Sequence, residues 1–360
     1  MTTDPNPLAP LEPILQDPKV TEIMIDGYQT VYIEKGGKLI DVPTPFRDND
    51  HLLETIRYIA MMVGRRVDES HPIVDLRLSD GSRVNVVIPP ISMIGPAMTI
   101  RKFFKEPLTL EKMLQSGSVN EPIVEFLRAC VTGLASIATC GGTGAGKTAL
   151  LNFLANMIPD DERIIVCENA SELRLRHKRL VVMETRPANL EGKGEVSMTD
   201  LVVNALKMRP ERIIVGEVRG PEALHLLAAM NTGHDGAMFT LHANSPQDAL
   251  TRLETMAGMA NPAIPLLTLR EQIASALNFL VQVERLRDGA RKVVRVAEVE
   301  GLEGGVIRLA DIFVYQQTGF ENGVVQGRHA PTGKIPAFMK QLRERGVNLP
   351  MEMFVPKMGG

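Results

Sequence analysis

The residues best suited to chemistry stand at 141–148, where the chain reads Gly-Gly-Thr-Gly-Ala-Gly-Lys-Thr. They match the phosphate-binding pattern G-x-x-x-x-G-K-[ST], the Walker A motif, in full. Glycines let backbone N–H groups curl around a phosphate, and the amino end of a following helix adds positive potential. Lys147 can reach the β- and γ-phosphates, while the Thr148 hydroxyl can coordinate Mg²⁺. The predicted phosphate-binding residues are Gly142, Thr143, Gly144, Ala145, Gly146, Lys147, Thr148 and Ala149.

The flanking segments give this pattern its meaning. Residues 135–140 form an apolar run that reads as a strand, and residues 147–157 read as a helix. A strand before the loop and a helix after it are the setting that the motif requires, which disfavours a chance match by a glycine-rich turn. The sequence therefore predicts binding of a nucleoside triphosphate with Mg²⁺.

A second candidate is Glu217, which closely follows the apolar strand expected at 213–215. In open α/β sheets, ligands lie off the carboxyl ends of the strands, so Glu217 should face the phosphates. A carboxylate there can accept a proton from the attacking water, hold the water in line, or approach the metal. The alternative role for Glu217 is to cap the helix expected after it. The phosphate loop upstream favours catalysis.

Glu168 ends another apolar strand, at 164–167, and should lie at the same sheet edge. It could orient water or contribute to the magnesium shell, together with Thr148 and Glu217. A solvated carboxylate in a turn is an equally open interpretation of Glu168.

Two histidines invite a metal interpretation, but their spacing opposes it. The strand expected at 236–241 separates His234 from His242 by roughly 20 Å, at about 3.3 Å per residue. They cannot share one ion. His242 falls at the carboxyl end of that strand, where it could sense the γ-phosphate. His234 falls at the opposite edge, and a single histidine is more often a structural group.

Composition fits a two-domain globular protein. The chain has 360 residues, 44% hydrophobic and 23% charged, with a formal net charge of −3. A near-neutral balance with only 4% aromatic residues gives no support for direct nucleic-acid binding. The 19 methionines are spread over both regions and are better explained as core filling than as a docking surface.

Cysteine usage and hydropathy bear on location. Cys130, Cys140 and Cys167 stand inside apolar runs without C-x-x-C spacing, which predicts buried, reduced thiols and a cytoplasmic location. No basic-then-apolar leader is evident, and no apolar run approaches the ~18 residues that a membrane span needs. Any membrane association is expected to be peripheral and to go through a partner.

Alternating patterns predict an α/β fold in two parts. Residues 1–100 read as a small antiparallel-sheet α/β domain, with strands expected at 21–25, 30–34, 74–78, 83–88 and 97–100 and a helix at 50–63. Residues 101–110 would be a linker. Residues 111–320 alternate strands and helices, which implies a mostly parallel sheet with helices on both faces. Residues 321–360, punctuated by glycine and proline, are expected to be a C-terminal extension.

Several spaced motifs beyond the phosphate loop resemble one family, the type II/IV secretion ATPases. Their closest match is the CpaF-type ATPase of tight-adherence (Tad/Flp) pilus assembly. In the second region the resemblance rests on residues 141–148, 168–173, 184–187, 191–194, 215–219, 230–234 and 241–244. Elsewhere it rests on residues 67–70, 80–85, 99–103, 270–274 and 332–333, and so covers nearly the whole chain.

The resemblance implies a hexameric ring of RecA-like P-loop domains that hydrolyses ATP in the presence of Mg²⁺. By this similarity Glu217 is the catalytic glutamate of the Walker B motif, Glu168 belongs to an acidic box, and His242 belongs to a histidine box. Arg83 and Arg101 match N-terminal arginines that reach the γ-phosphate across domains or subunits, a role that would couple domain closure to hydrolysis. Without the resemblance both would be read as surface arginines at strand ends.

The resemblance also implies a motor on the cytoplasmic side of the inner membrane, docked on a platform protein of the pilus or secretion system. Two positions depart from the family pattern: Asn169 replaces a usual aspartate, and Ala149 replaces a usual serine or threonine. Two alternatives stay open. One is a nucleotide-gated scaffold that barely hydrolyses ATP, which Asn169 makes reasonable, and the other is a RecA-like DNA motor.

Overall fold

The computed structural model describes residues 9–102, 109–189 and 193–356. The chain divides into two compact units, residues 1–106 and 107–360, and each is described by itself. Most of the predicted linker, at 103–108, lies outside the described residues. The same holds for residues 191–192 of the 191–194 motif and for residue 103 of the 99–103 motif.

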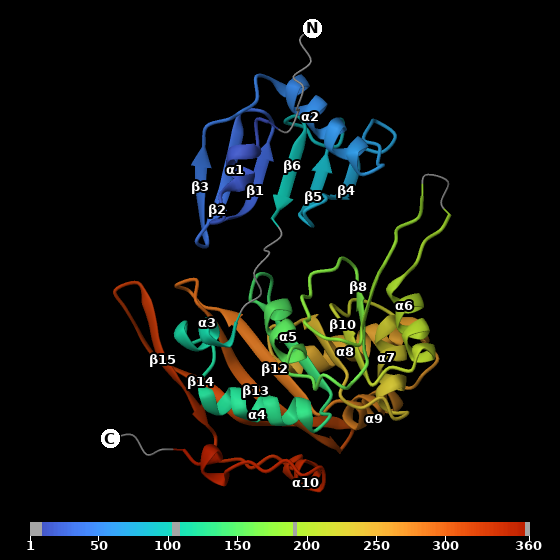
Figure 1. Cartoon of the computed structure of the whole chain (residues 1–360), viewed down its shortest axis with the longest axis vertical. Helices are drawn as coiled ribbons and strands as arrows, with labels where there is room; N and C mark the ends of the chain where they lie inside the picture. The colour runs from blue at the N-terminus through green and yellow to red at the C-terminus, as the bar shows by residue number, and fades with distance from the viewer. Residues whose placement is uncertain (1–8, 103–108, 190–192, 357–360) are drawn as a thin grey trace. The chain divides into compact units, whose positions relative to one another are not determined.

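The first unit is built on a six-stranded antiparallel sheet in the order β3-β2-β1-β6-β5-β4 (Figure 1). Its strands are β1 (Val20–Asp26), β2 (Thr30–Lys35), β3 (Lys38–Val42), β4 (Ile73–Arg77), β5 (Arg83–Val87) and β6 (Ala97–Arg101). The two helices are the short α1 (Glu12–Gln16) and α2 (Asn49–Met62). Strand β3 was not predicted, because it lies at the sheet edge and has no buried residue to produce an apolar alternation.

Helix α2 covers one face of this sheet. Its stripe of Leu52, Ile56 and Ile59 is fully buried and belongs to one cluster with the inward residues of the strands, such as Ile23 and Ile100. Asp48 caps the helix by accepting a hydrogen bond from the His51 backbone N–H. The remaining strand positions, at period two, point away from this core.

The second unit contains a nine-stranded sheet in the order β15-β14-β13-β12-β7-β11-β10-β8-β9. Its parallel part consists of β7 (Ile137–Gly141), β8 (Ile164–Glu168), β9 (Leu180–Glu184), β10 (Arg212–Val215), β11 (Met238–His242) and β12 (Phe279–Arg285). Strands β7, β8 and β10 are buried throughout, as expected for strands covered on both faces. The predicted α/β fold class is confirmed.

Helices cover both faces of the parallel part (Figure 1). On one face α4 (Glu121–Thr132) and α5 (Lys147–Ala155) share a core with alternate strand residues such as Ile137 and Ile164. On the other face the next strand residues, such as Ala138 and Ile165, pack under α6 (Met198–Ala205), α7 (Glu222–Met230), α8 (Pro246–Ala260) and α9 (Leu266–Ala276). Because it is packed on both faces, this sheet holds the residues at its strand ends in fixed positions.

The sheet continues beyond the parallel strands into a long antiparallel meander that was not predicted. It comprises β13 (Arg291–Glu303), β14 (Val306–Glu321) and β15 (Val324–Pro331). The expected C-terminal extension, 321–360, therefore supplies a sheet strand, and α10 (Met339–Glu344) adds Leu342 to the main core. Register shifts near Gly301 and Gly319 interrupt the alternation that would have revealed these strands.

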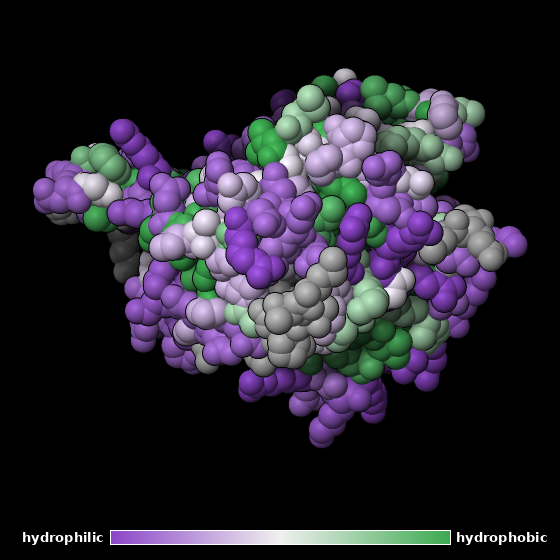
Figure 2. All heavy atoms as spheres, turned by 90° about the horizontal axis from the view of Figure 1, so that it is seen from above, coloured by the Kyte–Doolittle hydropathy of each residue, from purple (hydrophilic) through white to green (hydrophobic). Residues whose placement is uncertain are grey.

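The three cysteines lie in the hydrophobic interior as free thiols, and burial raises the pKa of Cys167 to about 12. All three are buried and none forms a disulfide, in agreement with the prediction of buried thiols. Hydrophilic residues cover much of the face shown in Figure 2, with hydrophobic residues in small groups between them. Among the helices of the described residues, none combines the length and the apolar character that crossing a bilayer requires.

Candidate active site

The phosphate loop lies between the carboxyl end of β7 and the first turn of α5. Gly144 and Gly146 adopt φ values of +68° and +102°, which residues with a side chain rarely adopt. Gly141 is needed for a different reason, since a Cβ there would lie 2.2 Å from the Val283 carbonyl oxygen of the neighbouring strand. The loop sequence is thus dictated by backbone conformation and by close packing.

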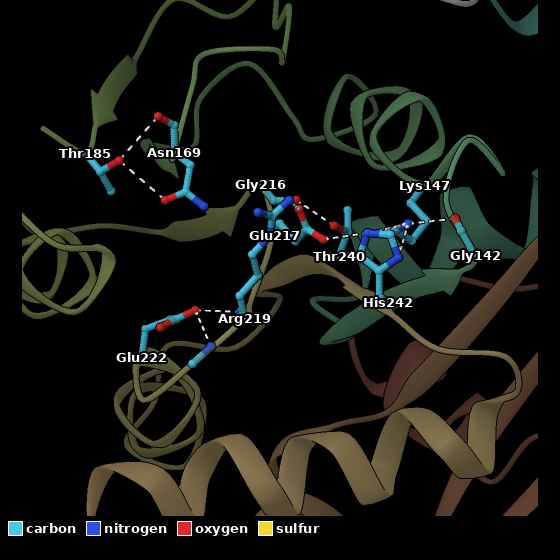
Figure 3. A network of polar contacts seen from close by, with 11 residues as sticks. Gly142, Lys147, Asn169, Thr185, Gly216, Glu217, Arg219, Glu222, Thr240 and His242 are labelled. Atoms are coloured by element: carbon cyan, nitrogen blue, oxygen red, sulfur yellow. Dashed lines mark hydrogen bonds and ion pairs between the residues drawn. The ribbon is translucent and has the colours of Figure 1, made fainter. Parts of the chain in front are cut away.

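Lys147 is buried at the centre of the site, with only 8% of its surface exposed. Its Nζ donates a hydrogen bond to the Gly142 carbonyl at 2.9 Å and lies 3.3 Å from Nδ1 of His242 (Figure 3). A buried ammonium held across its own loop is positioned to receive an anion that enters the loop.

Glu217 lies beside His242, two residues beyond the end of β10 (Figure 3). Its Oε1 is 3.0 Å from Nε2 of His242, and its Oε2 is paired with the Arg219 guanidinium. Within the described residues Oε1 is buried and makes no geometrically sound hydrogen bond, despite the short distance to His242. A buried carboxylate oxygen left without a hydrogen bond indicates a functional role or an occupant such as water.

Glu217 does not fill its alternative role of capping the next helix, since α7 begins after Pro221 without a side-chain cap. Glu222 begins α7, and its Oε1 accepts hydrogen bonds from the backbone N–H groups of Arg219 at 2.6 Å and Gly220 at 3.0 Å (Figure 3). Glu222 is itself buried. Glu217 is therefore left facing the phosphate loop side of the sheet rather than the helix.

Glu168 is the last residue of β8 and is 2% exposed, so it is not a solvated turn carboxylate. Its Oε1 accepts hydrogen bonds from the backbone of Glu172 and Leu173, while its Oε2 is buried without a partner in the described part of the chain. Burial raises the pKa of this carboxyl, and the two backbone hydrogen bonds oppose that shift. Gly216 makes room for Glu168, since a Cβ there would lie 2.9 Å from its Cγ.

His242 ends β11, in direct contact with Lys147 and Glu217. Burial first, and then the positive charge of Lys147, lower its pKa below the ordinary 6.5, although Glu217 acts in the opposite direction. The imidazole is therefore neutral at physiological pH. His234 precedes β11 at the other end of the strand, where its ring nitrogen lies 3.3 Å from the Ala229 carbonyl oxygen.

The predicted arginines of the first unit stand opposite each other across two strands. Arg83 of β5 is the register partner of Arg101 of β6, and Arg101 is in turn opposite Glu22, to which it lies 3.5 Å away. Both arginines occupy the sheet face that α2 leaves uncovered, because Val84 and Ile100 point into the core.

The two departures from the family pattern lie at the edges of the site. Asn169 is exposed. The Thr185 hydroxyl donates to its backbone carbonyl oxygen at 3.3 Å and to its side-chain Oδ1 at 3.4 Å (Figure 3). Ala149 sits in the first turn of α5, immediately after Thr148. Neither position removes a group from the contacts among Lys147, His242 and Glu217.

Three residues of the β12–β13 hairpin border the phosphate loop and were missed in the sequence. Arg285 and Arg291 are register partners, and Arg291 Nε donates to the Gly144 carbonyl at 2.9 Å. Gln282 is 1% exposed and lines a cavity beside the loop. The sequence Asp288-Gly289 is typical of a β-hairpin turn. A hairpin predicted there would have placed Arg285 opposite Arg291.

The donor set fits a nucleotide with a hard cation. The buried Lys147 and the glycine-rich loop suit a phosphate chain, and the orphaned carboxylate oxygens of Glu168 and Glu217 suit water or Mg²⁺. Among the described residues no three His, Cys, Asp or Glu side chains converge as a metal cage would require.

The parallel sheet order, with the phosphate loop after β7 and an acidic residue after β10, defines a RecA-like P-loop protein. The family model described as type II/IV secretion system protein matches residues 5–329. The chain belongs to this family.

Individual relatives match over most of their length. A Mycobacterium tuberculosis H37Rv protein, provisionally named as a conjugal transfer protein, is 35% identical over 302 residues, covering 82% of this chain and 85% of the relative. The conjugal transfer protein TrbB of Rhizobium radiobacter is 32% identical over 295 residues, covering 80% and 86%. The type IV secretion system protein PtlH of Bordetella pertussis is 34% identical over 280 residues, covering 70% and 82%.

Solved structures share the fold. The pilus retraction motor PilT, crystallised with ADP, aligns over 94% of this chain and 86% of its own, with a TM-score of 0.56 and 18% identity. The Legionella pneumophila ATPase DotB aligns over 82% and 81%, with a TM-score of 0.56 and 20% identity. At such low identity the likeness concerns the architecture alone.

Proposed function

We propose that this protein is an ATP-hydrolysing motor of a pilus or secretion system. The observation that carries this proposal is the continuous set of contacts from Gly142 through Lys147 and His242 to Glu217. It links a phosphate-binding loop to a partly buried carboxylate at the carboxyl ends of neighbouring parallel strands, where ligands bind in open α/β sheets.

In the proposed reaction Lys147 and the loop N–H groups hold the β- and γ-phosphates. Glu217 Oε1, which has no hydrogen bond in the described structure, accepts one from the attacking water and holds that water in line. His242 lies between Glu217 and Lys147 and contacts both. It senses the terminal phosphate, because a phosphate bound at Lys147 would alter these two contacts. Glu168 keeps its buried carboxylate at the neighbouring strand end, where it orients a second water.

Thr148, Glu168 and Glu217 are the residues that would hold Mg²⁺ in this site. Bound there, the cation would neutralise charge that develops on the transferred phosphoryl group. Arg83 and Arg101 would add positive charge at the γ-phosphate when the first unit closes over the nucleotide.

Family membership and the sequence resemblance support a proposal for the assembly. The protein acts as a homohexamer at the cytoplasmic face of the inner membrane, docked on an integral platform protein, and drives assembly or retraction of a Tad/Flp-type pilus. Nucleotide-driven movement of the first unit against the second would be passed to that partner.

Phosphate release by the purified chain, measured with Mg·ATP in the presence and absence of single- and double-stranded DNA, tests this proposal. We expect Mg-dependent turnover that DNA does not change, from a species with the mass of six chains. Turnover that rises several-fold with DNA would instead identify a DNA motor. Tight ATP binding without phosphate release would identify a scaffold, the alternative that Asn169 makes reasonable.

A further inference from the structure

A cavity of about 330 Å³ opens beside the phosphate loop, on the side away from Glu217. One wall is formed by Gly142, Thr143 and Ala145 of the loop, and the other by Asn244, Gln282, Glu284 and Arg285. Gln282 is almost fully buried, and its Nε2 donates to the Ala243 carbonyl at 3.2 Å. Its Oε1 has no hydrogen-bond partner in the part of the chain that the structure describes.

The strand order indicates which part of a bound nucleotide would lie in this cavity. The loop follows β7, the acidic residues Glu217 and Glu168 belong to the β10 and β8 side, and the cavity belongs to the β12 side. In Figure 3, Gly142 accordingly lies on the side of Lys147 away from Glu217. A terminal phosphate directed at Glu217 leaves the opposite end of the ligand toward β12.

The lining matches a sugar better than a purine or a further phosphate. Glu284, Gln282 and Asn244 supply carboxylate and amide oxygens, which accept hydrogen bonds from vicinal hydroxyl groups. Carboxylates at strand ends bind ribose hydroxyls in this way in other nucleotide-binding folds. Arg285 is the one cation among the residues that line this cavity, and it stands near the loop where the innermost phosphate would lie.

From this we infer that the cavity between the phosphate loop and β12 is a ribose subsite, in which Glu284 and Gln282 accept hydrogen bonds from the sugar hydroxyls. It makes the motor selective for ribonucleotides over their deoxy analogues. The inference rests on the proposed function, because it needs a nucleotide in the loop.

Equilibrium binding of Mg·ADP and Mg·2′,3′-dideoxy-ADP to the full chain tests the ribose subsite. We expect the wild type to bind ADP at least about tenfold more tightly, as expected when a hydrogen bond to a charged group is lost. In Glu284→Ala the two affinities should come within about threefold, mainly because ADP binds more weakly. The matched control Glu321→Ala changes an exposed carboxylate at the end of β14 and should keep the full preference.

Equal affinity of the wild type for both ligands would overturn the ribose subsite and leave nucleotide binding intact. A preference that survives in both Glu284→Ala and Gln282→Leu would also overturn it, since the hydroxyls would then be recognised elsewhere. Glu284 is only half-buried, near the end of β12, so Glu284→Ala is expected to fold. This variant therefore tests the subsite even if Gln282→Leu fails to fold. No binding of either ligand by the wild type would overturn the proposed function as well.

Discussion

At the scale of single residues, the site depends on small groups that make room for larger ones. Gly216 follows β10 directly, and its lack of a side chain leaves room for Glu168. A Cβ at this position would lie 2.9 Å from Glu168 Cγ and 3.3 Å from Oε1. The Gly216 carbonyl also accepts a hydrogen bond from the Thr240 hydroxyl at 2.7 Å, which fixes the backbone. Neither partner can move without disturbing the loop that carries Glu217.

We therefore predict that Gly216→Ala displaces the Glu168 carboxylate and lowers phosphate release at least about tenfold, as misplacement of a positioning group does. Affinity for Mg·ADP should change little, because the phosphate loop is untouched. Gly258→Ala in α8 is the matched control: its new Cβ meets only Leu269 at 3.8 Å. That variant should keep its activity and gain about 0.5–1 kcal/mol of stability. Equal rates in Gly216→Ala and the wild type would contradict the role of Glu168.

His242 predicts an acid limb in the activity. Its lowered pKa keeps the ring neutral above the ordinary histidine value of 6.5. As the pH falls below that value, protonation places a cation beside Glu217 and occupies the carboxylate oxygen that would receive the water. Phosphate release should therefore fall on the acid side, and His242→Gln should lose this limb while it keeps lower activity. A wild-type profile that stays flat from pH 8 to pH 5 would be inconsistent with a neutral, sensing histidine.

Much of this site was accessible from residue types, because a phosphate loop and strand-end acids have recognisable spacing. The sequence could not decide between catalysis and capping for Glu217, since the decision depends on Glu222 reaching back to the Arg219 and Gly220 backbone. It also left Glu168 open between a group that orients water or the magnesium shell and a solvated turn carboxylate. Burial depends on Gly216 of another strand, which only the folded sheet brings near.

At the scale of elements, the parallel strands were predictable because burial on both faces makes them continuous apolar runs. The meander of β13, β14 and β15 was not, since its strands are long, partly exposed and interrupted by register shifts. This meander nevertheless matters for the site. Its first strand begins with Arg291, which donates to the Gly144 carbonyl of the phosphate loop.

The meander contains a partly buried titratable group with a predictable effect on the free energy of unfolding. His329 of β15 lies 2.9 Å from the Val293 carbonyl oxygen and against the Tyr315 ring, and burial lowers its pKa from 6.5 to about 4. As the pH falls, His329 is therefore protonated at a higher pH in the unfolded chain than in the folded one. Stability is complete above pH 6.5 and is lost as the pH falls toward 4, by about 3 kcal/mol in total.

Urea unfolding between pH 7.5 and pH 4.5 measures this loss. His329→Gln keeps a hydrogen-bond donor but does not titrate, so its free energy of unfolding should decline less steeply over the same range. Parallel declines in both proteins would show that other groups, and not His329, cause the acid sensitivity of the meander.

At the scale of the whole molecule, we propose that charged groups from both units serve one reaction. The second unit has the phosphate loop and the acidic strand ends, and the first unit presents Arg83 and Arg101 in register on its uncovered sheet face. Like charges directly opposite each other are unfavourable, and Glu22, which lies 3.5 Å from Arg101, offsets part of this repulsion.

If these arginines act across a subunit boundary, two inactive variants should complement each other. Arg101→Ala and Glu217→Gln are each predicted to lower turnover about a hundredfold or more as separate proteins. Mixed rings contain some sites with both groups intact, so mixing should restore a measurable fraction of wild-type phosphate release. Mixtures that form rings but stay as inactive as their components would contradict arginine donation in trans.

The most direct test of the central claim is steady-state phosphate release from Mg·ATP by the wild type and by Glu217→Gln, with ATP affinity measured on both. Glutamine keeps the shape of the side chain but cannot act as a base, and Glu125→Gln, on an exposed position of α4, is the matched control. The account predicts that turnover in Glu217→Gln falls at least about a hundredfold while ATP still binds. Equal turnover in all three proteins would contradict it.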